Sequence, residues 1–426
     1  MDNPEVEKQS MLASFKLIKG NARVMTLAEP LFAIPLMMVT PFVTLYMYNL
    51  GVSDRQIGLL ASVVLLMQAI TALLGGPLTD KLGRRLTVAL ADVISWSIPS
   101  LIWMFAQNFW WFLAAAIIHG TLGIVLNSWQ WLFAEDADKK QLVAVYNCIH
   151  IISLLCIFFV PLSGLLMNRV GVVTGTRWLY LLMFIMMTTK FIVTYIFTKE
   201  TKQGKIKIEE MKNQSVLALT FKLGEVFRLI WHTPGTVVTI IFAIMLSVSG
   251  IAIGNFFFLY ANRSLGVPES WIVIFPMIRA VIATTFLFAV QHRIQVNAYR
   301  IPMLAGLAFY VVSHAALLLA PQAVNGVPIM MSYGFVIGFV IFEALALALL
   351  SPRASSLIIL NIEESQRMRI SSVITLLMLG ISAPFGFFIG TLSEFNPIMP
   401  FVFNIGLLAV MFVFVFCKIK NVYGDE

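Results

Sequence analysis

The chain has 426 residues, of which 59% are hydrophobic and only 12% are charged. Soluble domains carry roughly 25% charged residues, so this composition excludes an ordinary water-soluble protein. The mean hydropathy of +0.89 points the same way. At ~20 apolar residues per crossing, the length accommodates about twelve transmembrane helices. We therefore expect an all-α polytopic membrane protein and not an enzyme.

Apolar runs follow one another along the chain in two sets of six, identified with a window of about nineteen residues. The first set lies near 24–49, 56–76, 86–106, 109–133, 142–168 and 176–198, and the second near 234–261, 270–290, 301–321, 329–361, 370–391 and 398–417. The sequence thus predicts an N-terminal six-helix bundle over 1–198 and a C-terminal six-helix bundle over 234–426. Between them, 199–233 is predicted to be a polar cytoplasmic linker with an amphipathic segment over 216–231.

The positive charges are distributed unevenly between the connections. Most of the 29 Lys and Arg residues lie in the N-terminal segment, the linker and every second connection. The alternate connections hold only Arg55, Arg169, Arg177 and Arg263. Because cytoplasmic loops are enriched in Lys and Arg, this bias predicts a plasma-membrane protein with both termini in the cytoplasm. The net charge of +8 therefore reflects topology, and no nucleic-acid partner is needed to explain it.

The connection between the second and third runs has a distinctive pattern of glycine and charge. It reads Gly76-Pro77-Leu78-Thr79-Asp80-Lys81-Leu82-Gly83-Arg84-Arg85. The two glycines suit a tight turn between closely approaching helices. Asp80 is placed to meet a helix N-terminus, where an anion is stabilised. The two arginines can pair with carboxylates at a neighbouring helix end.

These ten residues resemble the G-x-x-x-D-[RK]-x-G-R-[RK] signature of the major facilitator superfamily at every defined position. The resemblance implies two six-helix bundles, each built of inverted three-helix repeats. It also implies a cytoplasmic latch that holds the outward-facing state. The expected latch residues are Gly76, Asp80, Lys81, Gly83, Arg84 and Arg85, with Glu135 or Asp136 as the acidic partner of Arg84.

Subfamily motifs are largely missing. Drug–proton antiporters of this superfamily have R-x-x-Q-G in the fourth helix, where this chain has Ala116-Ile117-Ile118-His119-Gly120. Their fifth-helix motif, G-x-x-x-G-P-x-x-G, is reduced here to Pro161 and Gly164. The substrate subfamily is therefore unassigned.

Four charged residues fall within predicted spans that the resemblance places around the central cavity. They are Arg279 and Glu343 near the midplane, Arg353 in the inner half, and Glu29 in the inner third of the first span. A charge in mid-membrane costs at least ~2.5 kcal/mol, so each needs a partner or a function. We expect the two arginines and Glu343 to contact substrate, and Glu343 and Glu29 to couple protons. The alternative is a structural ion pair between Arg279 and Glu343.

Polar residues in the fourth span form a second candidate set. On a straight helix His119, Asn127 and Gln130 fall within about 80° of one face, where they could contact substrate. They could equally join neighbouring helices by hydrogen bonds. Asn255 and Gln68 are weaker candidates.

Asp92 and Lys190 lie at similar depths in the third and sixth spans. The resemblance places these helices outside the cavity. The two side chains are therefore predicted to form a structural ion pair inside the N-terminal bundle.

Together these features predict a monomeric secondary active transporter that moves a small polar solute by alternating access and is coupled to protons. No nucleotide-binding motif is present to drive a pump, and we expect no metal or cofactor. The alternative is an exporter or uniporter of amphipathic compounds, including drugs, in which the buried charges are structural.

Overall fold

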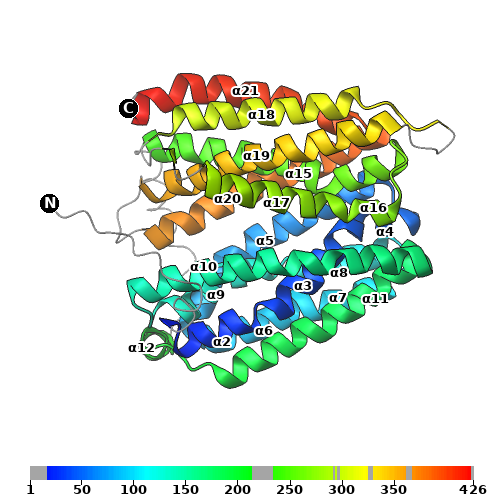
Figure 1. Cartoon of the computed structure of the whole chain (residues 1–426). Coiled ribbons are helices and arrows are strands. Elements are labelled where there is room, and N and C mark those ends of the chain that lie inside the picture. Colours follow the sequence, from blue (N-terminus) through cyan, green and yellow to red (C-terminus); the bar gives the residue numbers. More distant parts are fainter. Residues whose placement is uncertain are drawn as a thin grey trace.

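The computed structural model describes residues 17–213, 234–290, 293–294, 298–324, 330–360 and 367–423. Side chains at 127, 139–140, 234, 355, 358–360, 367–372 and 420–423 are outside this description. The amphipathic segment predicted over 216–231 also lies outside the described residues. The described chain is a bundle of long helices (Figure 1).

Three of the first four crossings in the N-terminal half are interrupted helices. The first consists of α2 (Gly20–Ala28), α3 (Pro30–Val39), η1 (Thr40–Phe42) and α4 (Val43–Asn49), and the second is the continuous α5 (Asp54–Leu82). The third consists of α6 (Arg84–Asp92), the π-helical η2 (Val93–Ser97) and α7 (Ile98–Phe105), and the fourth of α8 (Phe109–His119) and α9 (Leu122–Ala134). Next come α10 (Lys139–Cys156), η3 (Ile157–Phe159), α11 (Val160–Phe197) and the short α12 (Lys202–Met211).

The second half contains longer, less interrupted helices. They are α15 (Pro234–Arg263), α16 (Glu269–Ile272), α17 (Ile274–Ala289), α18 (Arg300–Leu319), α19 (Met330–Leu360), α20 (Arg367–Phe395) and α21 (Met399–Tyr423). Pro352 and Pro384 lie inside α19 and α20 without ending either helix.

Twelve membrane crossings follow from the helices in the described residues. Eleven helical runs are long and apolar enough to span a membrane, and one of them, Gln141–Phe197, has 57 residues. Gly171, with φ 76°, interrupts this run. A Cβ on Gly175 would lie 2.6 Å from the Met167 sulfur, so the segments on either side of Gly171 pack as a hairpin. The run therefore supplies two crossings.

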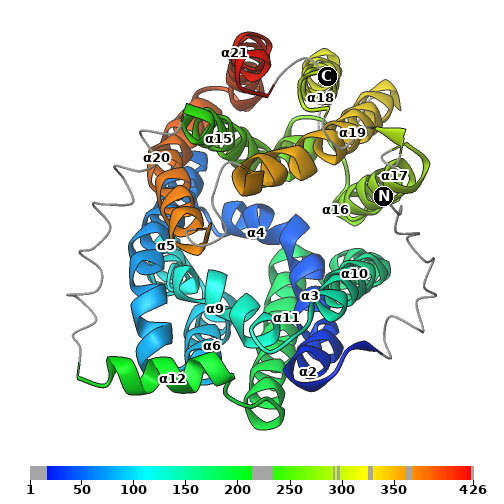
Figure 2. The ribbon, with the colours of Figure 1, turned by 90° about the vertical axis from the view of Figure 1, so that its left-hand side faces the viewer.

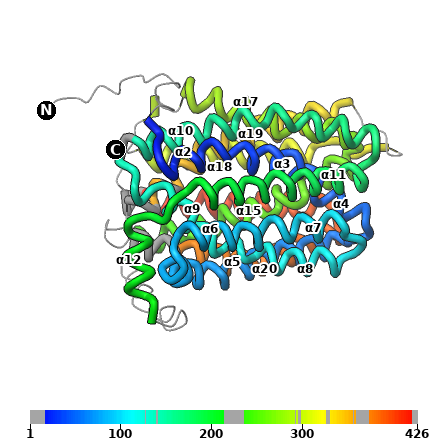
Figure 3. The backbone as a smooth tube through the Cα atoms, turned by 90° about the horizontal axis from the view of Figure 1, so that it is seen from below, coloured from blue at the N-terminus to red at the C-terminus, as the bar shows by residue number. Residues whose placement is uncertain are grey.

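The helices form two groups that enclose a central region (Figure 2). The group from α2 to α11 packs mainly within itself, as does the group from α15 to α21. The described ends of the chain lie at the same end of the molecule as α12 (Figures 1 and 3). We call this the terminal end, and the opposite end the distal end.

The two groups make their closest contact between α5 and α20. A Cβ on Gly58 would lie 2.3 Å from the Gly386 carbonyl oxygen and 2.7 Å from the Cα of Gly390. Because only glycine permits such an approach, the two backbones are in direct contact here. We call this contact the glycine seam.

Candidate functional site

A cavity of about 470 Å³ lies between the N-terminal helices and α15. Its wall comes from the distal halves of the first two crossings, from η2, α7, α8 and α11, and from residues 247–255 of α15. Four aromatic side chains line it: Trp96, Trp103, Phe112 and Tyr180. Most of the rest of the wall is aliphatic. Such a cavity, with few polar groups, is typical of a site for a small organic molecule.

The polar groups in the cavity wall are neutral side chains. They are Thr40, Thr44, His119, Tyr180, Ser247 and Asn255. Among the described residues that line the cavity, none is an Asp, Glu, Lys or Arg. A ligand held here would therefore meet aromatic faces and hydrogen-bonding groups, with no opposite charge to pair with.

His119 is held in position by the third crossing. Its Nδ1 lies 2.6 Å from the carbonyl oxygen of Ser95, which belongs to η2. Its ring packs edge-on against Trp96 and Trp103, with centroids 4.6 and 5.3 Å away. A π-helical turn leaves carbonyls without their usual α-helical partners. The irregular turn therefore supplies the acceptor that orients the imidazole.

The other two predicted residues of the fourth crossing do not join His119. Gln130 is exposed and does not line the cavity, and the Asn127 side chain lies outside the description. The helix is broken between α8 and α9 at Gly120 and Thr121, so the single-face geometry assumed for a straight helix is wrong. The break accompanies close contact with α5, where the Thr71 hydroxyl donates to the Gly120 carbonyl over 2.6 Å.

Arg279 and Glu343 form an ion pair within the C-terminal helices. Arg279 Nε lies 2.6 Å from Glu343 Oε2, and the Glu343 side chain is only 2% exposed. Neither residue lines the cavity described above. The geometry thus agrees with the alternative of a structural ion pair, and it does not support contact of Arg279 or Glu343 with substrate.

Arg353 is also separate from the cavity. It lies ten residues beyond Glu343 on α19, which is about 15 Å along the helix. Its Nε donates to the Ala298 carbonyl over 3.3 Å, and the residue is buried. This arginine therefore attaches the terminal end of α19 to the segment before α18.

Lys190 was expected to pair with Asp92, but it pairs with Glu29. Lys190 Nζ lies 3.0 Å from Glu29 Oε2, and the three residues are between 4% and 7% exposed. Asp92 is within electrostatic range of both. Sequence depth gave the right level in the membrane but not the rotation of each helix, and α3 packs directly on α11.

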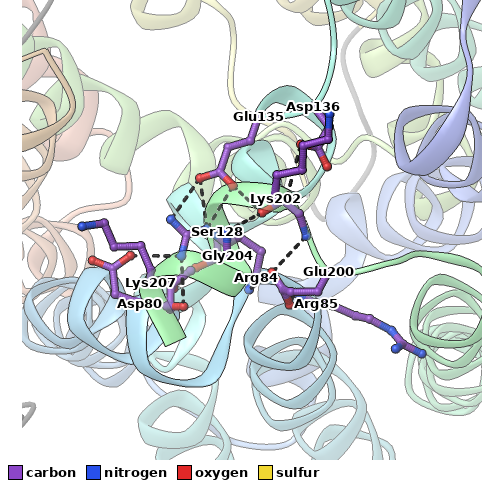
Figure 4. A network of polar contacts seen from close by, with 12 residues as sticks. Asp80, Arg84, Arg85, Ser128, Glu135, Asp136, Glu200, Lys202, Gly204 and Lys207 are labelled. Carbon is purple, nitrogen blue, oxygen red and sulfur yellow. Dashed lines mark hydrogen bonds and ion pairs between the residues drawn. The ribbon is translucent and has the colours of Figure 1, made fainter. Parts of the chain in front are cut away.

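Three charged residues of the signature, Asp80, Arg84 and Arg85, lie in a polar network at the terminal end (Figure 4). Gly76 lies inside α5 with open space around its Cβ, so the close helix approach expected there is wrong. The Arg84 guanidinium binds Glu135 through two nitrogens, at 3.0 Å each to Oε1, and Asp80 at 3.0 Å. Thr201 donates to the same Glu135 carboxylate over 2.5 Å, and Asp136 accepts from the Lys202 backbone over 3.3 Å. The network joins α5, α6 and α9 to the start of α12.

Glu200, which the sequence analysis did not single out, occupies the N-terminus of α6. Its two oxygens accept from the backbone N–H groups of Arg84 and Arg85 over 2.9 and 3.0 Å. Asp80 was expected at a helix N-terminus, but it binds Arg84. The anion at the N-terminus of α6 is Glu200. Gly83 has φ 85°, and a Cβ there would lie 2.5 Å from Glu200 Oε2, so the motif glycine admits this carboxylate.

A second polar network, at the distal end, joins the two groups of helices. Asp54 accepts from Arg263 over 2.8 Å and from the Ser393 hydroxyl over 2.7 Å. Glu394 accepts from the Ser53 hydroxyl and the Arg55 backbone over 3.1 and 3.0 Å. The local sequence pattern does not indicate which segments meet at the distal end, so these contacts could not be predicted.

A buried polar pair inside the C-terminal helices was also missed. Asn404 Nδ2 lies 2.7 Å from His314 Nε2, and both residues are fully buried. His314 Nδ1 is 2.8 Å from the Tyr310 carbonyl. The pair links α18 to α21, and neither residue lines the cavity, so we interpret it as a packing contact.

Comparisons with known proteins agree with this architecture. A model of the Major Facilitator Superfamily matches residues 26–341. The multidrug resistance protein MdtG of Serratia proteamaculans is 33% identical over 109 residues, which cover 24% of this chain and 26% of that protein. The quinolone resistance protein NorA of Staphylococcus aureus is 29% identical over 105 residues, covering 24% and 27%. The chain thus matches about a quarter of the length of these relatives.

Solved structures match over almost the whole chain. The nucleoside transporter NupG superimposes with a TM-score of 0.69 at 15% identity, covering 96% of this chain and all of that one. The peptide transporter POT superimposes with a TM-score of 0.68 at 14% identity, covering 98% and 99%. These similarities establish the fold. The family model covers most of the sequence, and the chain therefore belongs to the major facilitator superfamily, whose members are transporters of small molecules and not enzymes.

Proposed function

We propose that this protein transports amphipathic aromatic compounds across the cell membrane by alternating access. The observation that carries the proposal is the cavity of about 470 Å³, with its four aromatic side chains and neutral polar groups. Aromatic faces bind flat apolar molecules and also attract delocalised cations. The preferred ligand is therefore neutral or carries one delocalised positive charge.

The alternative of a small polar solute has less support. The prediction of a polar substrate relied on contacts with Arg279, Glu343 and Arg353. In the structure, Arg279 and Glu343 pair with each other, and Arg353 binds backbone carbonyls. A highly polar ligand in the aromatic cavity would lose hydration without gaining an ionic partner. The drug-resistance relatives named above are consistent with the amphipathic class.

The orientation is part of the proposal. The terminal end carries most of the Lys and Arg residues outside the helices, which favours a cytoplasmic position for both termini. The terminal-end network then lies on the cytoplasmic side, where the signature predicts a latch. In this arrangement the distal network lies on the outer face, and breaking it would open the cavity outward.

Transport can be tested with purified protein in liposomes. We would follow counterflow of ethidium, a flat aromatic cation, and compare it with uridine and with a dipeptide. The expected result is ethidium exchange with no exchange of the two polar compounds. Counterflow of uridine or the dipeptide without ethidium would overturn the proposal and favour a polar substrate.

The cavity itself can be tested by substitution. Trp103→Ala removes a wall residue and should weaken ethidium binding by about tenfold, the equivalent of ~1.4 kcal/mol, a typical aromatic contact. Trp110→Ala is a matched control because Trp110 is 71% exposed and does not line the cavity. Equal effects of the two changes would argue against this cavity as the binding site.

A further inference from the structure

Three charged side chains are buried together inside the N-terminal helices, away from solvent. Glu29 is on the first crossing, Asp92 on the third and Lys190 on the sixth. Their exposures are 7%, 5% and 4%. We call them the buried triad. Two carboxylates share one ammonium, so the fully ionised triad would carry one uncompensated negative charge in a low-dielectric interior.

Asp92 is the member without a contact partner. Lys190 is engaged by Glu29 at 3.0 Å. Within the described part of the chain, no hydrogen bond or ion pair at contact distance reaches the Asp92 carboxylate, which interacts with Lys190 and Glu29 only at longer range. An unpaired buried carboxylate costs several kcal/mol, and a bound proton removes that cost. The charge balance of the triad is thus completed by one proton.

Within the described residues, the only charges recorded as acting on Asp92 are those of Lys190 and Glu29. The Cys156 thiol on α10 lies within electrostatic range of Glu29. The Lys190 ammonium lies over the rings of Phe32, at 4.4 Å, and Trp129, at 5.9 Å. Aromatic rings stabilise the cation but cannot neutralise a second carboxylate.

Three buried hydroxyls extend from the triad toward the terminal end. Thr26, Thr87 and Thr194 lie roughly one turn or slightly more from Glu29, Asp92 and Lys190 on the same helices, each on the terminal side. They are at most 5% exposed. In the described residues their hydroxyl oxygens have no hydrogen-bond partner from protein. Unsatisfied buried hydroxyls usually hydrogen-bond to internal water, which can carry a proton.

The triad is connected to the cavity wall by packed aromatic side chains. Phe32, which carries the Lys190 ammonium on its face, meets Trp96 edge-to-face at 5.1 Å. Trp96 lines the cavity and contacts His119 at 4.6 Å. Asp92 precedes Trp96 by four residues on the same crossing. A change of charge at the triad therefore acts one side chain away from the cavity wall.

We propose that the buried triad is the proton-binding site of this transporter, filled from the terminal end past the three threonines and coupled to the cavity through Phe32 and Trp96. A proton from water binds a carboxylate oxygen of Asp92 or Glu29 and leaves by the reverse step, so no other reactant is needed. Coupling to the cavity rests on the proposed function, whereas proton binding does not. This assignment moves coupling from Glu343 to the N-terminal helices.

Proton binding can be measured without any substrate. Infrared difference spectra of the full-length protein in lipid nanodiscs, recorded during a pH titration, report the carbonyl stretch of protonated carboxyl groups. We expect one titrating band that disappears in the Asp92→Asn, Glu29→Gln double variant and remains in Glu343→Gln, which removes the buried carboxylate of the other half. A double variant whose spectrum superimposes on that of the native protein would overturn the proposal.

Coupling is tested by the pH dependence of ethidium affinity. We expect native affinity to change by about fivefold or more across the titration of the band, and Asp92→Asn to bind with an affinity independent of pH. If Asp92→Asn does not fold, Glu29→Gln serves, because it leaves Asp92 as the partner of Lys190. Unchanged pH dependence in the folded variants overturns the coupling. Absence of ethidium binding at every pH would refute the proposed substrate class alone, since the infrared titration still decides the proton site.

Discussion

The polar networks at the two ends of the molecule are built on different plans. At the terminal end, Arg84, Glu135 and Glu200 connect helices of the N-terminal half to one another and to the linker helix α12. At the distal end, Asp54 and Glu394 connect the N-terminal half to α15 and α20 of the other half. One network organises a single group of helices, and the other holds two groups together.

Because of this difference, we expect mutations in the two networks to affect different properties of the protein, namely its stability and its conformational equilibrium. Removing a group from the terminal-end network leaves buried or partly buried charges of the same half without a partner, so the fold of that half is weakened. Removing a group from the distal network weakens an interface that a rocking transporter must break in each cycle. The first kind of change should lower the melting temperature, and the second should redistribute conformations.

The largest expected effect is that of Arg84→Ala. This change leaves Glu135 and Asp80, whose side chains are 18% and 30% exposed, without their cation. Each lost hydrogen bond between charged groups contributes ~1.5–3 kcal/mol. We expect a lower melting temperature in detergent and loss of ethidium transport. Arg84→Lys should recover only part of the stability, because lysine lacks the planar fork that binds Glu135 through two nitrogens. A melting temperature equal to that of the native protein would contradict the terminal-end plan.

The glycine seam should be next in magnitude. Gly58→Val would place its Cβ against the Gly386 carbonyl at 2.3 Å, forcing α5 and α20 apart at a cost of ~1–3 kcal/mol. We expect transport to fall while each half remains folded. Gly406→Ala, which has open space around its Cβ, is the control and should behave as native. Equal transport by Gly58→Val would show that the two halves do not need this contact.

Asp54→Asn tests the distal network directly. It removes the ion pair with Arg263, and we expect a shift of ~1–2 kcal/mol toward a state with the distal end open, with little change in melting temperature. Thr44→Cys lines the cavity and can report access to a membrane-impermeant thiol reagent added from the distal side. The exposed Cys417 would be replaced first, since Cys148 and Cys156 are buried. Unchanged labelling would place the closing contact elsewhere.

Glu394→Gln should have the smallest effect. This residue is exposed, and the hydrogen bonds that its carboxylate accepts from Ser53 and Arg55 are in contact with solvent. Exposed charge interactions contribute ~0–1 kcal/mol. Combined with Asp54→Asn in a double-mutant cycle, the labelling assay would reveal whether the two carboxylates act together. Additive effects would indicate two independent contacts.

Much of the fold could be predicted from sequence because its signals are repeated along the chain. The apolar runs predict twelve spans, and the ten-residue signature indicates the superfamily. The site is different, because it depends on helix rotation and on irregular turns. The Asp92–Lys190 pairing was wrong since depth along a helix does not fix the direction of a side chain, and Lys190 turns toward Glu29.

The other differences arise from a helix break, from backbone partners and from contacts between residues far apart in the sequence. His119 does line a cavity, but the break at Gly120 separates its face from that of Gln130. Glu200 was not identified because its partners are backbone N–H groups, which leave no mark in the sequence. Asp54 binds Ser393, and Glu394 binds the Arg55 backbone, each across 339 residues of chain, and a single sequence carries no signal for such contacts.

The π-helical turn in the third crossing has a consequence for motion. Over Val93–Ser97 the helix contains a wider turn than an α-helix. If this turn became α-helical, the residues on one side of it would advance by ~1.5 Å and rotate by about 100° relative to the other side. Asp92 lies on one side of the turn and Trp103 on the other. The third crossing therefore has a built-in register shift of one residue, which would turn the part of the cavity wall formed by Trp103 relative to Asp92.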